Sequence, residues 1–309
     1  MRYDIDSMNK LNVFYRTSTN APSAEQLQEV VDNTNPLVLT TGNTLLKQDY
    51  QHNVFTRFSH NNLKNKTSYF AFIGARFSNQ YIAKSTVIAN SDTSIWGANL
   101  SRGSQISRSV NLDGYYNFRA FLNYTLPVKY LKSNLNINIG GNYTRTPGLF
   151  NEKLNFANTP NVSGGLVLSS NISDKVDFTI SHNTSYSDVK NTLNTTLNNT
   201  FINYTNKVKL NWEFISKYYI NTEATQQIYA GLSSGFNQNY TLWNLSIAKK
   251  FLKNDAGDIR ITVYDLLKKN RAISRTFTDT YTEDATSNVL QRYYMVTFTY
   301  TFRNFKQVK

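Results

Sequence analysis

The chain has 309 residues, of which 40% are hydrophobic, and carries a formal net charge of +13. It contains no cysteine, which excludes disulfides, thiol catalysis and zinc sites built on cysteine, and no apolar run of about 18 residues, which excludes a transmembrane helix. Abundant Tyr, Phe, Asn and Thr with few Glu favour strands over helices. Lys and Arg are scattered singly or lie in turns, so we expect no nucleic-acid partner.

Alternating hydrophobicity recurs along the chain and predicts about twelve strands. Within residues 134–140, Leu135, Ile137 and Ile139 alternate with asparagines. Because successive side chains of a strand point to opposite faces, each such segment has one apolar and one polar face. The predicted strands lie near residues 8–18, 47–60, 67–84, 105–126, 133–146, 154–171, 175–187, 198–214, 217–230, 239–251, 257–265 and 290–303.

The N-terminal part of the chain carries two further signals. Residues 1–6 contain no apolar stretch, so we expect no signal peptide in this chain. Residues 22–31 begin with Pro and a Ser cap, continue with acidic and Gln residues, and place Leu27, Val30 and Val31 on one side. This pattern predicts a short helix in the first long connection between strands.

The connections between the predicted strands alternate between short and long. The short turns lie at residues 61–66, 127–132, 173–175, 215–217 and 253–257, and the longer segments at residues 19–46, 85–104, 147–153, 188–196, 232–238 and 266–289. Short turns on one side and long loops on the other are typical of outer-membrane barrels. The closing segment, residues 294–302, places large apolar residues at every second position with threonines between them. The sequence therefore predicts an all-β fold, a transmembrane antiparallel β-barrel of about 12 meander strands over residues 1–309.

Several segments resemble the Bacteroidota outer-membrane β-barrel family that is related to TonB-dependent receptors. Residues 35–37 (Asn-Pro-Leu) and 42–47 (Gly-Asn-Thr-Leu-Leu-Lys) are similar to a family segment that precedes a strand, with Thr44 in place of the usual Pro. Residues 263–270 resemble the penultimate strand and its exit, and residues 288–300 resemble the closing strand. The resemblance implies the C-terminal part of a transporter-type barrel, which in these receptors has 22 strands around a plug. No plug domain and no TonB-contacting segment is predicted in this chain.

Charged residues that alternate with apolar ones are the candidates for residues that face the lumen of the barrel and contact a solute. They are Arg76, Arg119, Lys207, Lys209 and Glu213. A polar lumen keeps such groups in water, where they bias passage or contact a plug. The alternative is that these side chains are solvated and have no selective role.

Aromatic residues fall into two candidate groups. Those at the ends of predicted strands are candidate membrane-interface residues, namely Trp212, Phe214, Tyr300 and Phe302. Those in outer connections either contact a ligand or pack the loops, namely Tyr229, Phe236, Tyr240, Phe277 and Tyr281.

The sequence contains no recognisable catalytic or metal-binding motif. Its histidines, His52, His60 and His182, are isolated, and the first two lie about 27 Å apart at the rise of a strand. The serines near His182 lack the context of a nucleophile elbow. We therefore expect no enzyme activity, no metal and no cofactor.

The pattern favours one function over three others. We expect the β-barrel of a TonB-dependent-receptor-like protein in the cell outer membrane of a Gram-negative organism, forming part of the wall and outer vestibule for solute uptake. Its expected partners are outer-membrane lipid, an unknown small solute, and a plug domain or a missing barrel half. The alternatives are a plugless porin-like barrel or surface adhesin, a soluble β-rich polysaccharide-binding protein, and an outer-membrane enzyme.

Overall fold

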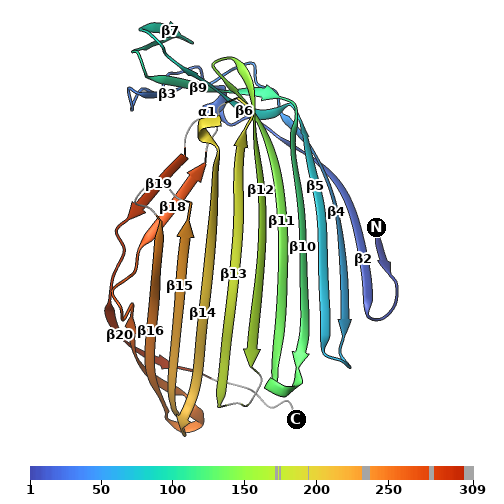
Figure 1. The fold of residues 1–309 in the computed structure, drawn as a ribbon, viewed down its shortest axis with the longest axis vertical. Coiled ribbons are helices and arrows are strands. Elements are labelled where there is room, and N and C mark those ends of the chain that lie inside the picture. The colour runs from blue at the N-terminus through green and yellow to red at the C-terminus, as the bar shows by residue number, and fades with distance from the viewer. Residues whose placement is uncertain (171–172, 174, 194, 232–236, 278–281, 303–309) are drawn as a thin grey trace.

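The computed structural model describes the whole chain except residues 171–172, 174, 194, 232–236, 278–281 and 303–309. A long antiparallel sheet forms a wall, and a smaller group of strands lies over one end of it (Figure 1). We call these two parts the wall and the cap. No helix in the described part of the chain is long and apolar enough to cross a membrane.

The wall is a meander in which each strand pairs with the next wall strand along the chain. In order, its strands are β1 (Arg2–Asp4), β2 (Asn9–Asn20), β4 (Asp49–Asn62), β5 (Thr67–Asn79), β10 (Tyr115–Val128), β11 (Ser133–Phe150), β12 (Lys153–Ser170), β13 (Val176–Asn191), β14 (Asn199–Ile215), β15 (Tyr218–Ala230), β16 (Gln238–Phe251), β17 (Gly257–Tyr264) and β20 (Tyr293–Tyr300). Each of the twelve predicted strands has a counterpart among them. The predicted all-β antiparallel meander is therefore confirmed.

The sheet is open at both sides. In the described part of the chain, β20 pairs with β17 alone, and the outer edge of β2 pairs only with the short β1. The predicted closure into a barrel is not observed, because no ladder joins β20 to β2 among the residues described.

Two predicted strands, residues 67–84 and 105–126, each break into two. The chain adopts a positive φ of 54° at Gln80 and of 98° at Gly114, which ends the wall strands β5 and β10 at the same level. The backbone N–H of Gln80 donates to the Asp113 carboxylate at 2.8 Å, so the two breaks stabilise each other. Beyond them, β6 (Tyr81–Ile88) and β9 (Gln105–Leu112) pair with each other and leave the wall.

The cap is built around the β6–β9 pair. β3 (Val38–Thr40) adds to β9 in parallel, and β7 (Thr93–Ile95) and β8 (Ala98–Leu100) form a separate hairpin. The middle of β6 pairs in parallel with the end of β11. Its buried apolar core consists of Leu39, Ala89, Ala98, Leu100 and Ile106. The cap thus has a packed interior of its own.

The predicted helix over residues 22–31 is much shorter in the structure. α1 covers only Ala24–Leu27, although Ser23 and Gln26 form the expected capping box. The carbonyls of Gln26 and Gln28 accept hydrogen bonds from Asn43 and Gly42 instead of continuing the helix. A Cβ at Gly42 would lie 2.3 Å from the Gln28 carbonyl oxygen, so only glycine allows this close approach.

The alternation of short and long connections largely holds. The short turns after β4, β10, β14 and β16 lie at the end opposite the cap, and they include the single turns η1 (Lys129–Leu131) and η3 (Lys253–Asp255) (Figure 1). The predicted connections at residues 173–175 and 232–238 lie partly outside the described residues. The cap end holds the longer connections, with η2 (Thr195–Leu197) and the hairpin of β18 (Ala272–Phe277) and β19 (Thr282–Ser287). The prediction of a longer segment at residues 147–153 is wrong. There β11 and β12 continue to a two-residue turn at Asn151 and Glu152, whose φ values are 47° and 65°.

The pairing register separates the wall into two chemically different faces. One row joins apolar residues across seven strands, through Leu126, Leu135, Leu168, Ile180, Val208, Ala224 and Trp243. The face that carries this row, which we call the apolar face, exposes Ile73 by 66%, Ile261 by 57% and Val296 by 68%. The opposite side, the polar face, carries most of the wall's asparagines, threonines, serines and charges.

Candidate functional site

All five charged residues predicted to face a lumen lie on the polar face, but they form two separate groups. Arg76 on β5 and Arg119 on β10 are diagonal neighbours, because Arg76 pairs with Asn117. The Arg76 Nε donates to the Asn53 side-chain oxygen at 2.8 Å. The other three residues lie on β14, across several intervening strands.

The residues on β14 have local partners. Lys207 Nζ lies 2.9 Å from a carboxylate oxygen of Glu223 on β15, and Lys209 stands opposite Glu223 in the register. Glu213 accepts a hydrogen bond from the backbone N–H of Lys217 at 2.8 Å and so stabilises the β14–β15 turn. Sequence reasoning missed Glu223, whose charge becomes meaningful only once the pairing of β14 with β15 is known.

Sequence reasoning also missed a group of phenylalanines on the polar face of the first wall strands. Phe14 and Phe55 stack with ring centroids 4.9 Å apart, and the Phe55 and Phe72 centroids are 6.1 Å apart. The Arg57 guanidinium carbon lies 5.2 Å from the Phe55 ring centroid. Alternation alone places these rings on the same side as the arginines, but their proximity depends on the register between strands.

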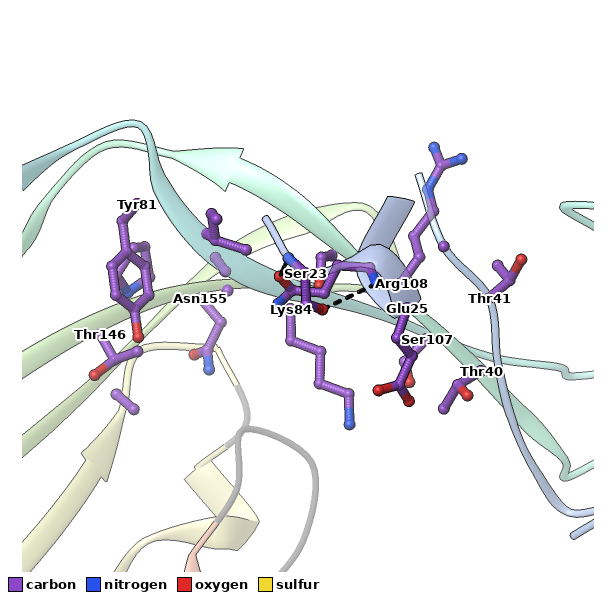
Figure 2. A pocket seen from close by; sticks show the side chains of 18 of the residues that line it. Ser23, Glu25, Thr40, Thr41, Tyr81, Lys84, Ser107, Arg108, Thr146 and Asn155 are labelled. Carbon is purple, nitrogen blue, oxygen red and sulfur yellow. Dashed lines mark hydrogen bonds between the residues drawn. The ribbon is translucent and has the colours of Figure 1, made fainter. Parts of the chain in front are cut away.

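A cavity of about 840 Å³ lies between the cap and the cap end of the polar face. Thr146 of β11 and Asn155 of β12 line it from the wall, and Tyr81 lines it from β6. Figure 2 shows the side chains of Glu25 and Lys84 extending into this space. The cavity has a mixed polar and apolar lining, with the carboxylate of Glu25 and the ammonium group of Lys84 available to a solute.

The other two charged residues that line the cavity are held by their neighbours. Asp32 accepts hydrogen bonds from the hydroxyl and the backbone N–H of Thr34, and these bonds lower the pKa of its carboxyl group. The Arg108 guanidinium lies over the Trp96 ring, 4.2 Å from its centroid. Among the described lining residues, Glu25 and Lys84 therefore differ from Asp32 and Arg108 in having no hydrogen bond, ion pair or ring contact with another side chain.

The four predicted interface aromatics lie at the end of the wall with the short turns. The rings of Trp212 and Phe214 are 6.0 Å apart, and those of Tyr300 and Phe302 are 4.5 Å apart. Trp212 and Tyr300 belong to the apolar face, where they are 43% and 45% exposed. Further ring pairs occupy the apolar face toward the cap, at Phe77 with Phe118 and Tyr116 with Tyr143.

The histidines are hydrogen-bonded to neighbouring strands of the apolar face. His52 pairs with the Tyr15 hydroxyl at 2.8 Å, His60 with Asn9, and His182 with Asn206. In the described part of the chain, no three His, Cys, Asp or Glu residues are arranged to hold a metal ion.

The predicted outer aromatics are only partly described. Tyr229 and Tyr240 lie on the polar face near the cap end of β15 and β16, and the Tyr240 hydroxyl donates to the Arg271 carbonyl at 3.4 Å. Phe236, Tyr281 and the side chain of Phe277 lie outside the described residues. A shared ligand site of these aromatics stays a prediction.

The segments that carry the family resemblance have structural roles. Asn43 donates to the Ser109 carbonyl at 3.0 Å and ties the first connection to β9. Asp265 is buried and accepts from the backbone N–H groups of Lys269 and Asn270, which shapes the exit of β17. Comparison of the chain with protein-family models, curated proteins and solved structures finds no match.

Proposed function

We propose that the chain forms part of the wall and the outer vestibule of an outer-membrane β-barrel for the uptake of a small solute, of the type found in TonB-dependent receptors. The observation that carries the proposal is the exposed apolar face, which continues from β2 to β20. Soluble proteins rarely expose an apolar surface that extends over so many strands, because water does not favour it. Lipid would cover this face without cost.

The height of the apolar face agrees with a bilayer. On β14, the apolar-face positions from Tyr204 to Trp212 span about 27 Å at a rise of about 3.4 Å per residue. All of them are apolar or aromatic except Asn206, whose side chain is hydrogen-bonded to His182 and Gln226. At a tilt of about 40° this corresponds to roughly 20 Å along the bilayer normal, close to the apolar band of about 25 Å in outer-membrane barrels. Aromatic rings near both ends of this band suit the two lipid–water interfaces.

The asymmetry of the ends supports an orientation. Short turns of outer-membrane barrels face the periplasm and long loops face outward. In this orientation the cap and the cavity with Lys84 and Glu25 lie on the outer side, where a solute arrives. The cavity is then the outer vestibule of the proposal.

The proposal requires that both sheet edges are paired in the membrane. An unpaired edge in hydrocarbon costs several kcal/mol for each unsatisfied backbone group. The wall has twelve strands when counted from β2 to β20, and each is antiparallel to the next, so β2 and β20 run in opposite directions. They can therefore pair with each other or with the strands of a further barrel segment.

Reconstitution tests the proposal. The chain would be purified in detergent and added to vesicles of bacterial outer-membrane lipid, followed by protease treatment from outside. We expect the wall to be protected and to gain heat-dependent mobility on electrophoresis, as inserted sheets do. A chain that stays monomeric and soluble without detergent would contradict the proposal.

A further inference from the structure

We infer that the polar face of β2, β4, β5 and β10 binds an anionic solute that carries an aromatic ring. The inference names the charge and shape class of the solute in the proposed uptake function, and rests on that function. Ten side chains form the surface, which we call the arginine–phenylalanine patch: Lys10, Phe14, Arg16, Phe55, Arg57, Phe70, Phe72, Arg76, Phe121 and Arg119.

The register places these residues in four adjacent rows. The row nearest the cap runs through Arg16, Asn53, Arg76 and Asn117, and the next through Phe14, Phe55, Gly74 and Arg119. The third runs through Asn12, Arg57, Phe72 and Phe121, and the fourth through Lys10, Ser59, Phe70 and Asn123. Diagonal neighbours in such a sheet are about 7–8 Å apart at their Cα atoms, so one small solute can reach several cations.

The patch differs from the rest of the polar face because its cationic side chains have no acidic partners. None of the residues in the four rows is Asp or Glu, and in the described structure none of the five cations forms an ion pair. On β14 to β17 the situation is different, because Lys207 pairs with Glu223 and Arg260 lies 3.7 Å from Asp258. A positive potential therefore persists over the patch and is neutralised over the other part of the polar face.

The phenylalanines provide a surface for a flat ring. Phe14 and Phe121 are 39% and 41% exposed, although they lie on the polar face. The Phe72 ring folds over Gly74, where a Cβ would approach it to 2.9 Å, so glycine keeps the centre of the patch flat. Arg57 packs against the Phe55 and Phe72 rings, which leaves Lys10, Arg16, Arg76 and Arg119 as the cations available to the solute.

The arginines and the phenylalanine rings of the patch determine which class of solute it can bind. Arginine forks bind phosphate, sulfonate or carboxylate groups through paired hydrogen bonds. The rings at the centre of the patch stack with an aromatic group between the anionic contacts. A neutral sugar can stack on the rings but has no anionic group to compensate the arginine charges, and a cationic solute is repelled.

Fluorescence anisotropy of the whole chain in detergent tests the inference, with pyrenetetrasulfonate as the probe. The variant Arg16→Gln/Arg76→Gln/Arg119→Gln is compared with Lys207→Gln/Lys209→Gln/Arg260→Gln, which removes the same charge from the other part of the polar face. We expect the first variant to bind the probe at least about tenfold more weakly, which is about 1.4 kcal/mol, and the second to stay within about twofold. Added salt weakens binding to the wild type.

A second pair of measurements separates the ring from the charge. Phe14→Ser/Phe121→Ser should weaken binding of pyrenetetrasulfonate several-fold and leave competition by tripolyphosphate unchanged.

Equal losses of affinity in the two triple variants would mean a diffuse attraction to net charge and would overturn the inference, as would a wild-type chain that does not bind the probe. If circular dichroism shows that the arginine triple variant does not fold, the probe affinity of the single variant Arg119→Gln tests the inference instead, since this side chain is exposed and its replacement should not affect folding. The binding measurements do not depend on insertion into vesicles. A failure of the solute-binding inference can therefore be distinguished from a failure of the proposed function.

Discussion

The wall and the cap place their apolar residues in opposite ways. In the cap, Leu39, Leu100 and Ile106 are buried against one another, and Ile106 is fully inaccessible. In the wall, apolar side chains such as Ile139 and Val162 are more than half exposed, and they occur on strand after strand. The cap buries its apolar residues as a water-soluble protein does, whereas the wall is stable in this arrangement only if something apolar covers its apolar face.

This contrast indicates two different surroundings for one chain. The β6–β9 pair leaves the wall at Gln80 and Gly114, and the packing pattern changes at the same level. The proposed location in an outer membrane would account for both changes, because it places a boundary between lipid and water at this level. The predictions below test whether the two regions respond differently to similar substitutions.

The largest effect is expected from Ile106→Ala in the cap. Removing a fully buried isoleucine costs about 2–5 kcal/mol, because the cavity is only partly refilled. Amide hydrogen exchange of the cap residues in detergent measures this loss. The matched substitution Ile139→Ala, at a position 53% exposed on the apolar face, should change exchange much less. Similar losses of exchange protection at both positions would show that the cap and the wall do not differ in how they depend on buried apolar side chains.

In the wall, Ile137→Arg should impair assembly into vesicles by about 2–4 kcal/mol, since it places a charge on the apolar face in the region expected to meet hydrocarbon. The adjacent Asn138→Arg lies on the polar face and should be tolerated, apart from about 1 kcal/mol for the hydrogen bond from Asn123. The fraction of chain that becomes protease-resistant in vesicles is the readout. Equal damage from both variants would count against the assignment of the faces.

Gly42→Ala should loosen the first connection of the cap by about 1–3 kcal/mol, because the new methyl group meets the Gln28 backbone. Hydrogen exchange at Gly42 and Asn43 would report the change. Gly141→Ala in the wall is the control, since its Cβ would meet nothing closer than 3.9 Å. Unchanged exchange in the Gly42 variant would show that this approach does not restrain the cap.

The smallest effect is expected from Ser23→Ala, which removes the cap of α1. The Ser23 side chain accepts from the Gln26 backbone N–H, and loss of such a cap costs about 1 kcal/mol. Limited proteolysis within residues 21–32 should become faster. Ser59→Ala, on the polar face of the wall, should leave this rate unchanged. If both variants are cleaved like the wild type, α1 contributes nothing to the order of the connection.

Much of the wall could be predicted from alternation alone. The period of two at Leu135, Ile137 and Ile139 depends only on the geometry of a strand, and it correctly places them on one face with the asparagines opposite. The orientation of Arg76 and Arg119 follows from the same rule. The departure of β6 and β9 from the wall could not be predicted, because the three consecutive polar residues Ser78, Asn79 and Gln80 interrupt the alternation without indicating which strand pairs with the chain beyond them.

The sequence by itself determined the strands, their two faces and the end at which the short turns lie, because these depend on neighbours along the chain. Only the tertiary structure decided which side chains meet across strands. Phe14 and Arg119 share a row although more than a hundred residues separate them, and Lys207 finds Glu223 only through the register of β14 with β15. The register of each pair depends on the turn between the two strands and on the hydrophobic patterns of both strands together, so it cannot be read from the residues around one side chain alone.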